Sequence, residues 1–413
     1  MISNRKKIIL GKLFKKYKEN QNISTIDIEH ASISSTKTLY QSFNGEIIFN
    51  NQFYIDYSNF FNHEYKNVEE INIWLSNFIV RMIQAFDYYE ENDFDNLYNE
   101  FITKMNDYKE YAIYHEYYQV IQSLFNYYIN NKYLRLEEVE DYLNLIDIDL
   151  LPKELSLYLL DYMFRSNWNY IGNKELPNII AHKMESIDAT HYITKYQKGF
   201  FYKFNRNFIQ SLNELNQCIN DSKDKNNKYR EVQSRLAIYA IYRNIDNLMA
   251  KETANMLIEY KKISTIPGSL KHSINYNVGM QDFLEGKYER AYELFNENLI
   301  EYHSYFTLLF QCSICSRLGL EYPKELFSKE IEERYDFIYL DYFRKKCNQE
   351  EYDKLARYVL KTVIPKKLKD EVYRNPYWSL FEYEMYDMAD KDTKLKKYYV
   401  NFMKEVKKYC KDA

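Results

Sequence analysis

The chain has 413 residues but only 8 Gly and 6 Pro, so these two chain breakers make up about 3.4% of it, against roughly 12% in an average protein. Residues that adopt positive φ or mark tight turns are therefore scarce, which excludes a fold of many short strands and a Gly-rich phosphate-binding loop. The net charge of −4, from 56 basic and 60 acidic residues, favours no particular partner. We expect a mainly helical protein packed through the rings of its 45 Tyr and 25 Phe residues.

The amino-terminal segment is basic. Residues 1–18 carry seven basic residues and no acid, and residues 1–62 carry eight basic against five acidic residues. A helix is predicted over residues 6–18, with its lysines on one side and apolar residues on the other. Lysines such as Lys12 and Lys16 would give DNA phosphates a sequence-independent contact. The alternative is that they form only the solvated face of an amphipathic helix.

Three more short helices are predicted before residue 62. Ser24 is a good N-cap for a helix that ends at Ala31. The next helix begins at Ser34 or Ser35 and ends at Asn44-Gly45, where Gly is a good C-terminal stop. A fourth helix, over residues 52–61, presents four aromatic rings at helical spacing.

This segment resembles a helix-turn-helix of the Cro/C1-repressor type. The positions that match the turn apolar residue, the helix start, the buried residue and the stop are Ile33, Ser34 or Ser35, Leu39 and Gly45. Two positions depart from the pattern, because Phe43 replaces the usual acid and Glu29 replaces a small residue. The resemblance implies that the third helix enters the major groove of double-stranded DNA and reaches base edges with its first turns. The candidates for this contact are Ser35, Thr36, Lys37, Tyr40 and Gln41.

From about residue 67 onward, apolar residues recur at helical spacing, and one segment has the register of a known repeat. When His272 is numbered as position 1, Gly279 falls at position 8, Ala291 at position 20 and Phe295 at position 24. This resembles the tetratricopeptide repeat, in which small residues at positions 8 and 20 let two antiparallel helices approach closely. Weaker copies begin at Tyr192 and Glu231. The alternative is a generic helical bundle.

Such repeats stack into a right-handed superhelix with a concave inner surface. The first helix of each repeat would line that surface with aromatic rings, cations and amides, which suit an extended peptide. The residues predicted to contact it are Tyr196, Gln197, Phe200, Arg235, Tyr239, Arg243, Asn275, Tyr276 and Met280. The alternative is that these rings simply pack between helices.

A helix-turn-helix followed by degenerate repeats resembles the peptide-responsive regulators of Gram-positive bacteria, the group of Rap, Rgg, NprR, PlcR and PrgX. The resemblance implies an all-α fold with a DNA-binding domain over residues 1–66 and an α-solenoid of helix pairs over residues 67–413. It further implies a cytoplasmic, homodimeric transcriptional regulator, controlled by a short signalling peptide bound inside the repeats. The alternative is a repeat scaffold that does not bind DNA, in which the head is only a capping bundle.

No catalytic or cofactor motif is recognisable. The seven His residues show no paired metal-ligand spacing, and nucleotide-binding and hydrolase motifs are absent from the sequence. Cys312 and Cys315 form a CxxC pair in an apolar run without a second pair, which favours buried helical thiols over a zinc or redox site. The odd number of cysteines and the lack of a signal-like or membrane-spanning run indicate a reduced cytosolic compartment. We therefore expect no enzyme activity, no cofactor, no metal and no membrane contact.

Overall fold

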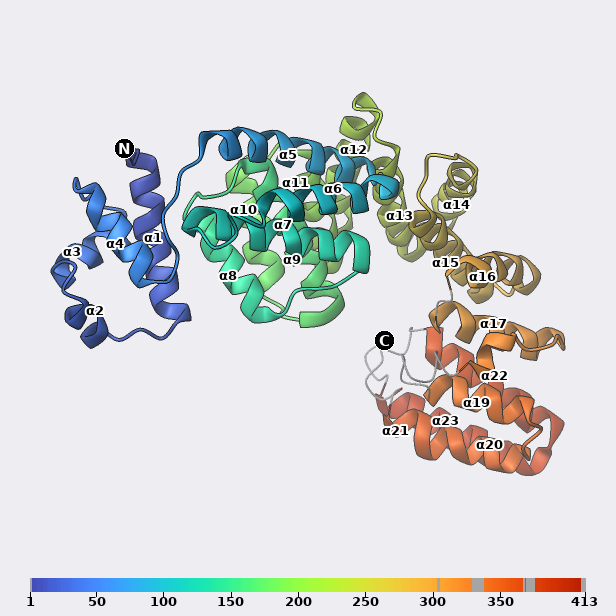
Figure 1. Ribbon diagram of the computed structural model, residues 1–413. Helices are drawn as coiled ribbons and strands as arrows, with labels where there is room; N and C mark the ends of the chain where they lie inside the picture. Colours follow the sequence, from blue (N-terminus) through green and yellow to red (C-terminus); the bar gives the residue numbers. More distant parts are fainter. Residues whose placement is uncertain (1, 303–304, 329–337, 367, 369–375, 410–413) are drawn as a thin grey trace. The chain divides into compact units, whose positions relative to one another are not determined.

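The computed structural model describes residues 2–302, 305–328, 338–366, 368 and 376–409 (Figure 1). The fold is all-α, as predicted, and the described residues contain no strand. The chain divides into two compact units, Met1–Ile241 and Tyr242–Ala413, and each is described here by itself. The domain boundary expected near residue 66 lies inside the first unit and stays a prediction. No helix in the described ranges is both long and apolar enough to cross a membrane.

The first unit begins with a head of four helices, as the sequence predicts (Figure 1). They are α1 (Asn4–Asn20), α2 (Thr25–Ala31), α3 (Thr36–Phe43) and α4 (Asn51–Phe60). The predicted cap Ser24 accepts a hydrogen bond from the Asp27 amide, and the Asp27 carboxylate accepts one in return from the Ser24 amide. Ser35 rather than Ser34 caps α3. Gly45 follows α3 with a φ of +84°, which glycine adopts without strain.

Aromatic rings fill the centre of the head. Phe14 of α1 is fully buried against Tyr54, Tyr57 and Phe61, with ring centroids 5.5 to 6.2 Å away. The backbones of α1 and α3 meet at Gly11, where an added Cβ would overlap a backbone carbonyl of α3. The orientation of α3 therefore depends on a glycine in the middle of α1.

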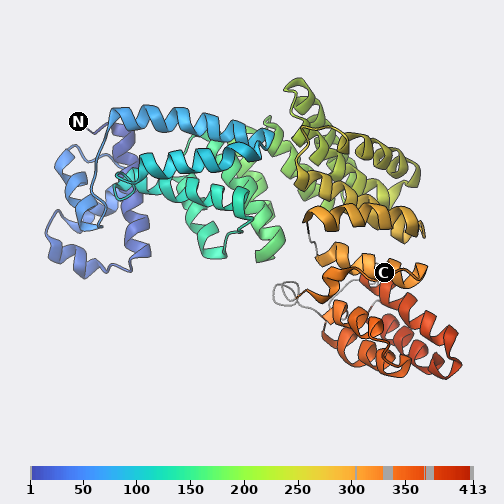
Figure 2. The same ribbon diagram turned by 45° about the vertical axis from the view of Figure 1, so that its right-hand side comes forward.

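The rest of the first unit is a series of helices that pack on their sequence neighbours. They are α5 (Glu69–Tyr88), α6 (Glu91–Met105), α7 (Ala112–Asn130), α8 (Leu136–Asp147), α9 (Lys153–Ser166), the π-helical turn η1 (Asn167–Ile171), α10 (Leu176–Asp188), α11 (Tyr192–Phe204), α12 (Phe208–Asp224) and α13 (Lys228–Ile245). Figure 2 shows α5, α6 and α7 side by side. Their contacts are largely aromatic, and the Phe86 and Tyr128 rings stack with centroids 3.9 Å apart.

The second unit continues the helix pairs. Its elements are α14 (Asn247–Lys261), α15 (Gly268–Leu284), α16 (Tyr288–Tyr302), α17 (Tyr305–Leu318), η2 (Lys324–Phe327), α19 (Ile338–Cys347), α20 (Tyr352–Tyr358), η3 (Val359–Val363), α21 (Ile364–Lys366), α22 (Pro376–Lys391), η5 (Thr393–Leu395) and α23 (Lys396–Tyr409). One hydrophobic cluster runs through this unit from Met280 to Val406, with Trp378 fully buried in it.

The close approach predicted at two repeat glycines is confirmed. In the pair α11–α12, a Cβ at Gly199 would lie 2.6 Å from Cγ of Leu215. In the pair α15–α16, a Cβ at Gly279 would lie 2.8 Å from Cε1 of Phe295. In both pairs the glycine at position 8 faces the residue at position 24, so a side chain at position 8 would force the two helices apart.

Candidate nucleic-acid interface and peptide-binding surface

The predicted base-reading residues lie on α3 and the residue before it. Ser35, Lys37 and Tyr40 are exposed, whereas Thr36 and Gln41 are half-buried. The Thr36 hydroxyl donates to Glu29 at 3.4 Å, and the Gln41 amide donates to Glu46 at 3.0 Å.

The charge of this surface is low. Lys37 is the one charged residue of α3, and two carboxylates, Glu29 and Glu46, accept hydrogen bonds from Thr36 and Gln41 of the same helix. Phosphate contacts account for most of the affinity of a DNA-binding module. Under the predicted DNA binding, such contacts would come mainly from another part of the head.

The predicted phosphate-binding lysines of α1 face the repeats in this structure. Lys16 is buried, and its Nζ lies 2.6 Å from Oε2 of Glu116 in α7. Lys12 is half-buried and lines a cavity of about 260 Å³ together with Asp147 and Ile148, at the end of α8 and just beyond it. Their role in phosphate binding stays a prediction.

Aromatic and imidazole rings surround the Lys16–Glu116 pair. The Tyr17 hydroxyl donates to the carbonyl oxygen of Ala112 at 3.2 Å, and burial together with the neighbouring Glu116 carboxylate raises the Tyr17 pKa well above its usual value. The Tyr17 ring also packs on His63, with centroids 4.4 Å apart. Burial lowers the pKa of His63, and so does the adjacent imidazole of His115. The neutral imidazole is therefore favoured at this junction between head and repeats.

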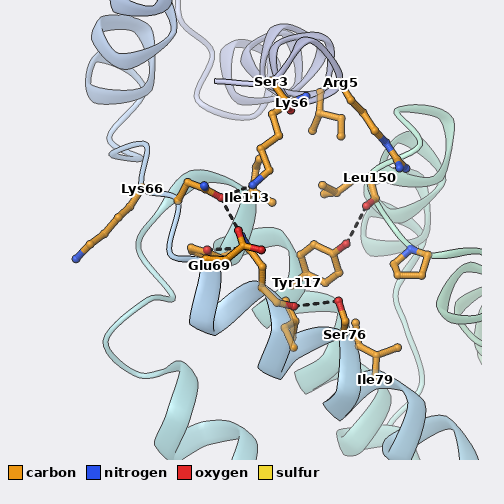
Figure 3. A pocket seen from close by; sticks show the side chains of 16 residues that line it. Ser3, Arg5, Lys6, Lys66, Glu69, Ser76, Ile79, Ile113, Tyr117 and Leu150 are labelled. Atoms are coloured by element: carbon orange, nitrogen blue, oxygen red, sulfur yellow. Dashed lines mark hydrogen bonds between the residues drawn. The ribbon is translucent and has the colours of Figure 1, made fainter. Parts of the chain in front are cut away.

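A cavity lies at the start of α1. It has a volume of about 520 Å³ and is lined by residues of α1, α5, α7 and the segment that joins α8 to α9. Figure 3 shows Lys6 and Arg5 reaching over it from α1, while the Tyr117 hydroxyl donates to the carbonyl of Leu150 at 2.9 Å. Arg5 pairs with Asp149 at 3.5 Å, and both side chains are exposed. The head therefore rests on the repeats through polar contacts with open space between them.

The residues of the first unit that are predicted to contact the peptide are buried or half-buried. Tyr196, Gln197 and Tyr239 are buried, whereas Phe200 and Arg235 are half-buried. Gln197 donates to Asp161, and Arg235 donates to Glu231 at 2.9 Å. Tyr239 thus fits the alternative prediction, in which these rings pack between helices. Peptide contact by these residues stays a prediction.

An exposed aromatic stack continues from Phe200. Trp168 in the π-helical turn η1 is 55% exposed, and its ring lies 3.5 Å from the ring of Phe204. The Lys203 ammonium lies 5.0 Å from the Phe200 ring. Trp168 is not among the predicted peptide contacts, because it stands outside the repeat register and no local pattern predicts a π-helical turn. π-Helical turns occur often at functional sites.

A buried charge network holds the helices behind this stack. Asp161 of α9 pairs with Arg165 at 3.1 Å and lies 3.8 Å from Arg230 of α13. Arg230 is fully buried and also lies 3.5 Å from Asp87 of α5. Burial alone would raise the pKa of Asp161, but the two guanidinium groups keep it below its usual value. The network therefore ties α5, α9 and α13 together through ionised groups.

In the second unit, four predicted contacts lie on or near α15. Arg243 donates to Gln281 at 2.9 Å and Asn275 donates to Glu297 at 3.0 Å. The other two are Tyr276, which is half-buried, and Met280, which is buried. These four also stay predictions for peptide contact.

The CxxC pair lies on α17 of the same unit. Cys312 and Cys315 are both buried, as expected for helical thiols. Burial raises the pKa of Cys315 to about 11, which disfavours the thiolate that binds metals and reacts.

Comparison with known proteins gives one structural likeness. No family model and no curated protein sequence matches the chain. Among solved structures, it is similar to the apo form of the quorum sensor NprR from B. thuringiensis, with a TM-score of 0.55 and 14% sequence identity. The match covers 82% of this chain and 99% of that one. At this identity the likeness establishes a shared helical fold.

Proposed function

We propose that this chain is a DNA-binding transcriptional regulator whose repeats bind a short signalling peptide. The observation that carries the proposal is the combination of an exposed polar surface on α3 with an exposed Trp168–Phe204 stack between η1 and α11. The fold shared with a structure named as a quorum sensor supports it. A homodimer would fit the regulatory role, and the exposed Tyr386 and Val400 near the carboxyl end offer a contact for it.

DNA binding is tested with the full-length chain and duplexes from its own locus, by fluorescence anisotropy over a salt series. Replacing both Lys37 and Gln41 by Ala should remove the preference for one duplex over the others, because those side chains would read base edges. Lys153→Ala is the matched control, because it removes one positive charge at an exposed position on α9, outside the head. If the double variant and the control bind every duplex alike, base reading by α3 is refuted.

Peptide binding is tested by tryptophan fluorescence. Of the three tryptophans, Trp378 is fully buried and Trp74 is half-buried, so an exposed-site signal should come mainly from Trp168. Synthetic peptides encoded by small reading frames beside the gene should shift that emission on binding. Trp168→Phe should abolish the signal, whereas Trp74→Phe should keep it. A signal that survives in Trp168→Phe would place the peptide elsewhere.

The second candidate is a repeat scaffold in which the head is a cap without DNA contact. The burial of Lys16 against Glu116 favours it, because a capping helix is expected to bury polar contacts against its neighbour. Under this alternative, the full chain binds a protein or peptide partner equally well with and without the Lys37 and Gln41 substitutions. It also binds no duplex above the level of an unrelated acidic protein.

A further inference from the structure

The first helix lies against an acidic surface of the repeats. We call this the acidic face and define it as Glu116 of α7, Asp141 and Asp147 of α8, and Asp149 after α8. Helix α8 carries five acidic residues and neither Lys nor Arg. Charge complementarity thus runs along the junction, with basic residues on α1 and carboxylates opposite them.

The contacts along this junction differ greatly in burial. Lys16 pairs with Glu116 with side-chain exposures of 9% and 1%, whereas the side chains of the Arg5–Asp149 pair are 71% and 80% exposed. The Asn20 amide donates to both oxygens of Asp141 at 3.3 Å. Exposed pairs add little to binding, whereas a buried pair fails when one partner is removed. The Lys16–Glu116 pair is therefore the contact on which docking depends most.

Three cavities separate α1 from the repeats, with volumes of about 520, 300 and 260 Å³. Figure 3 shows the first of them beneath Lys6 and Arg5. An interface of scattered polar contacts around cavities lacks the continuous apolar packing of a permanent one. The head can therefore leave the repeats at lower cost than a helix within the solenoid could.

The same lysine is one of those predicted to contact DNA phosphate. Lys37 is the one charge of α3, so α1 would supply most phosphate contacts, and Lys16 cannot join them while Glu116 holds it. We propose that the acidic face autoinhibits DNA binding by holding Lys16 of α1, so that DNA and the acidic face compete for this lysine. This inference rests on the proposed DNA-binding function.

Two measurements on the full chain test the inference. The first is amide hydrogen exchange at the junction, where the Ala112 amide donates to the carbonyl of Glu64 at 3.1 Å. The second is affinity for a random-sequence duplex over a salt series. Glu116→Gln keeps the shape of the side chain but removes its charge, so it should speed amide exchange at the junction. It should also tighten duplex binding about tenfold, because the DNA-binding-competent state would rise from about a tenth of the population to nearly all. The released Lys16 should also steepen the salt slope by about 0.9 per phosphate contacted.

Two matched variants accompany it. Glu137→Gln, at an exposed position on α8, removes one charge outside the acidic face and should change neither measurement. Lys16→Met combined with Glu116→Leu replaces the ion pair with an apolar pair, which should keep the junction closed. Amide exchange at its junction should match that of the parent chain, and its affinity for the duplex should not rise. Parent-like exchange would also show that the junction folds without the two charges.

The outcomes separate the inference from the proposed function. Faster exchange in Glu116→Gln without tighter duplex binding, in a parent chain that does bind DNA, overturns autoinhibition alone. Unchanged exchange in Glu116→Gln overturns the role of the Lys16–Glu116 pair in closing the junction and leaves the DNA-binding proposal untouched. No duplex binding by any variant, even with the junction open, overturns both proposals together.

Discussion

Replacing Arg230 by Met should strongly destabilise the first unit. Arg230 is fully buried, with its guanidinium 3.5 Å from the Asp87 carboxylate and 3.8 Å from that of Asp161. Asp161 keeps Arg165 at 3.1 Å, so Asp87 is the acid left without a partner cation. Breaking a buried pair from one side costs about 3–5 kcal/mol. In a unit of this size that lowers the melting temperature by about 6–20 °C, at about 2–4 °C per kcal/mol.

Circular dichroism at the helical band, followed during heating and in urea, measures the loss. Arg230→Met combined with Asp87→Asn should recover much of it, because the unpaired charge is then gone. Arg81→Met is the control, since it breaks an exposed pair with Glu100, worth about 0–1 kcal/mol. If Arg230→Met and Arg81→Met lower stability equally, or if the double variant is no better than the single one, the argument from buried charge is refuted.

Three further predictions concern the head. Gly11→Ala should destabilise the head by about 1–3 kcal/mol, because the new Cβ meets the Ser42 carbonyl. This overpacking outweighs the gain of about 1 kcal/mol in helix propensity. A higher melting temperature would contradict the prediction. Burial and the nearby His115 lower the folded-state pKa of His63 below 6.5, so the unfolded state binds more protons and stability falls as pH drops below about 6.5. The melting temperature of His63→Gln should depend less on pH across that range than that of the parent chain. Ser35→Ala should cost about 1 kcal/mol of stability, since Ser35 caps α3; if the melting temperature is unchanged, that cap contributes nothing.

Local signals predicted the helices well. Ser24 and Gly45 mark helix boundaries through side-chain capping and positive φ, which depend on a few neighbouring residues. Gly199 and Gly279 were placed correctly because a fixed spacing from position 8 to position 24 brings glycine opposite a large side chain. These features can be read from short stretches of sequence because their physical causes are local or periodic.

Long-range contacts account for what the sequence did not show. Lys16 reads as one of several exposed lysines, yet its partner Glu116 lies a hundred positions away in the chain. The repeat register predicts that the Gln197 amide contacts a peptide backbone, but in the structure it donates to Asp161. Arg230 drew no attention at all, because nothing in its local pattern distinguishes a buried guanidinium from an exposed one.

Two buried ion-pair systems in the first unit are expected to respond differently to the loss of a charge. Asp161 has two guanidinium partners and an amide donor, so it keeps one cation when either Arg165 or Arg230 is lost. Glu116 has one cation partner, Lys16, beside a cavity of about 300 Å³. Once that pair breaks, water can reach the carboxylate through the cavity, and the cost of separation falls because the charge is hydrated again. Similar chemistry therefore makes a permanent brace between helices in one place and a releasable contact between head and repeats in the other.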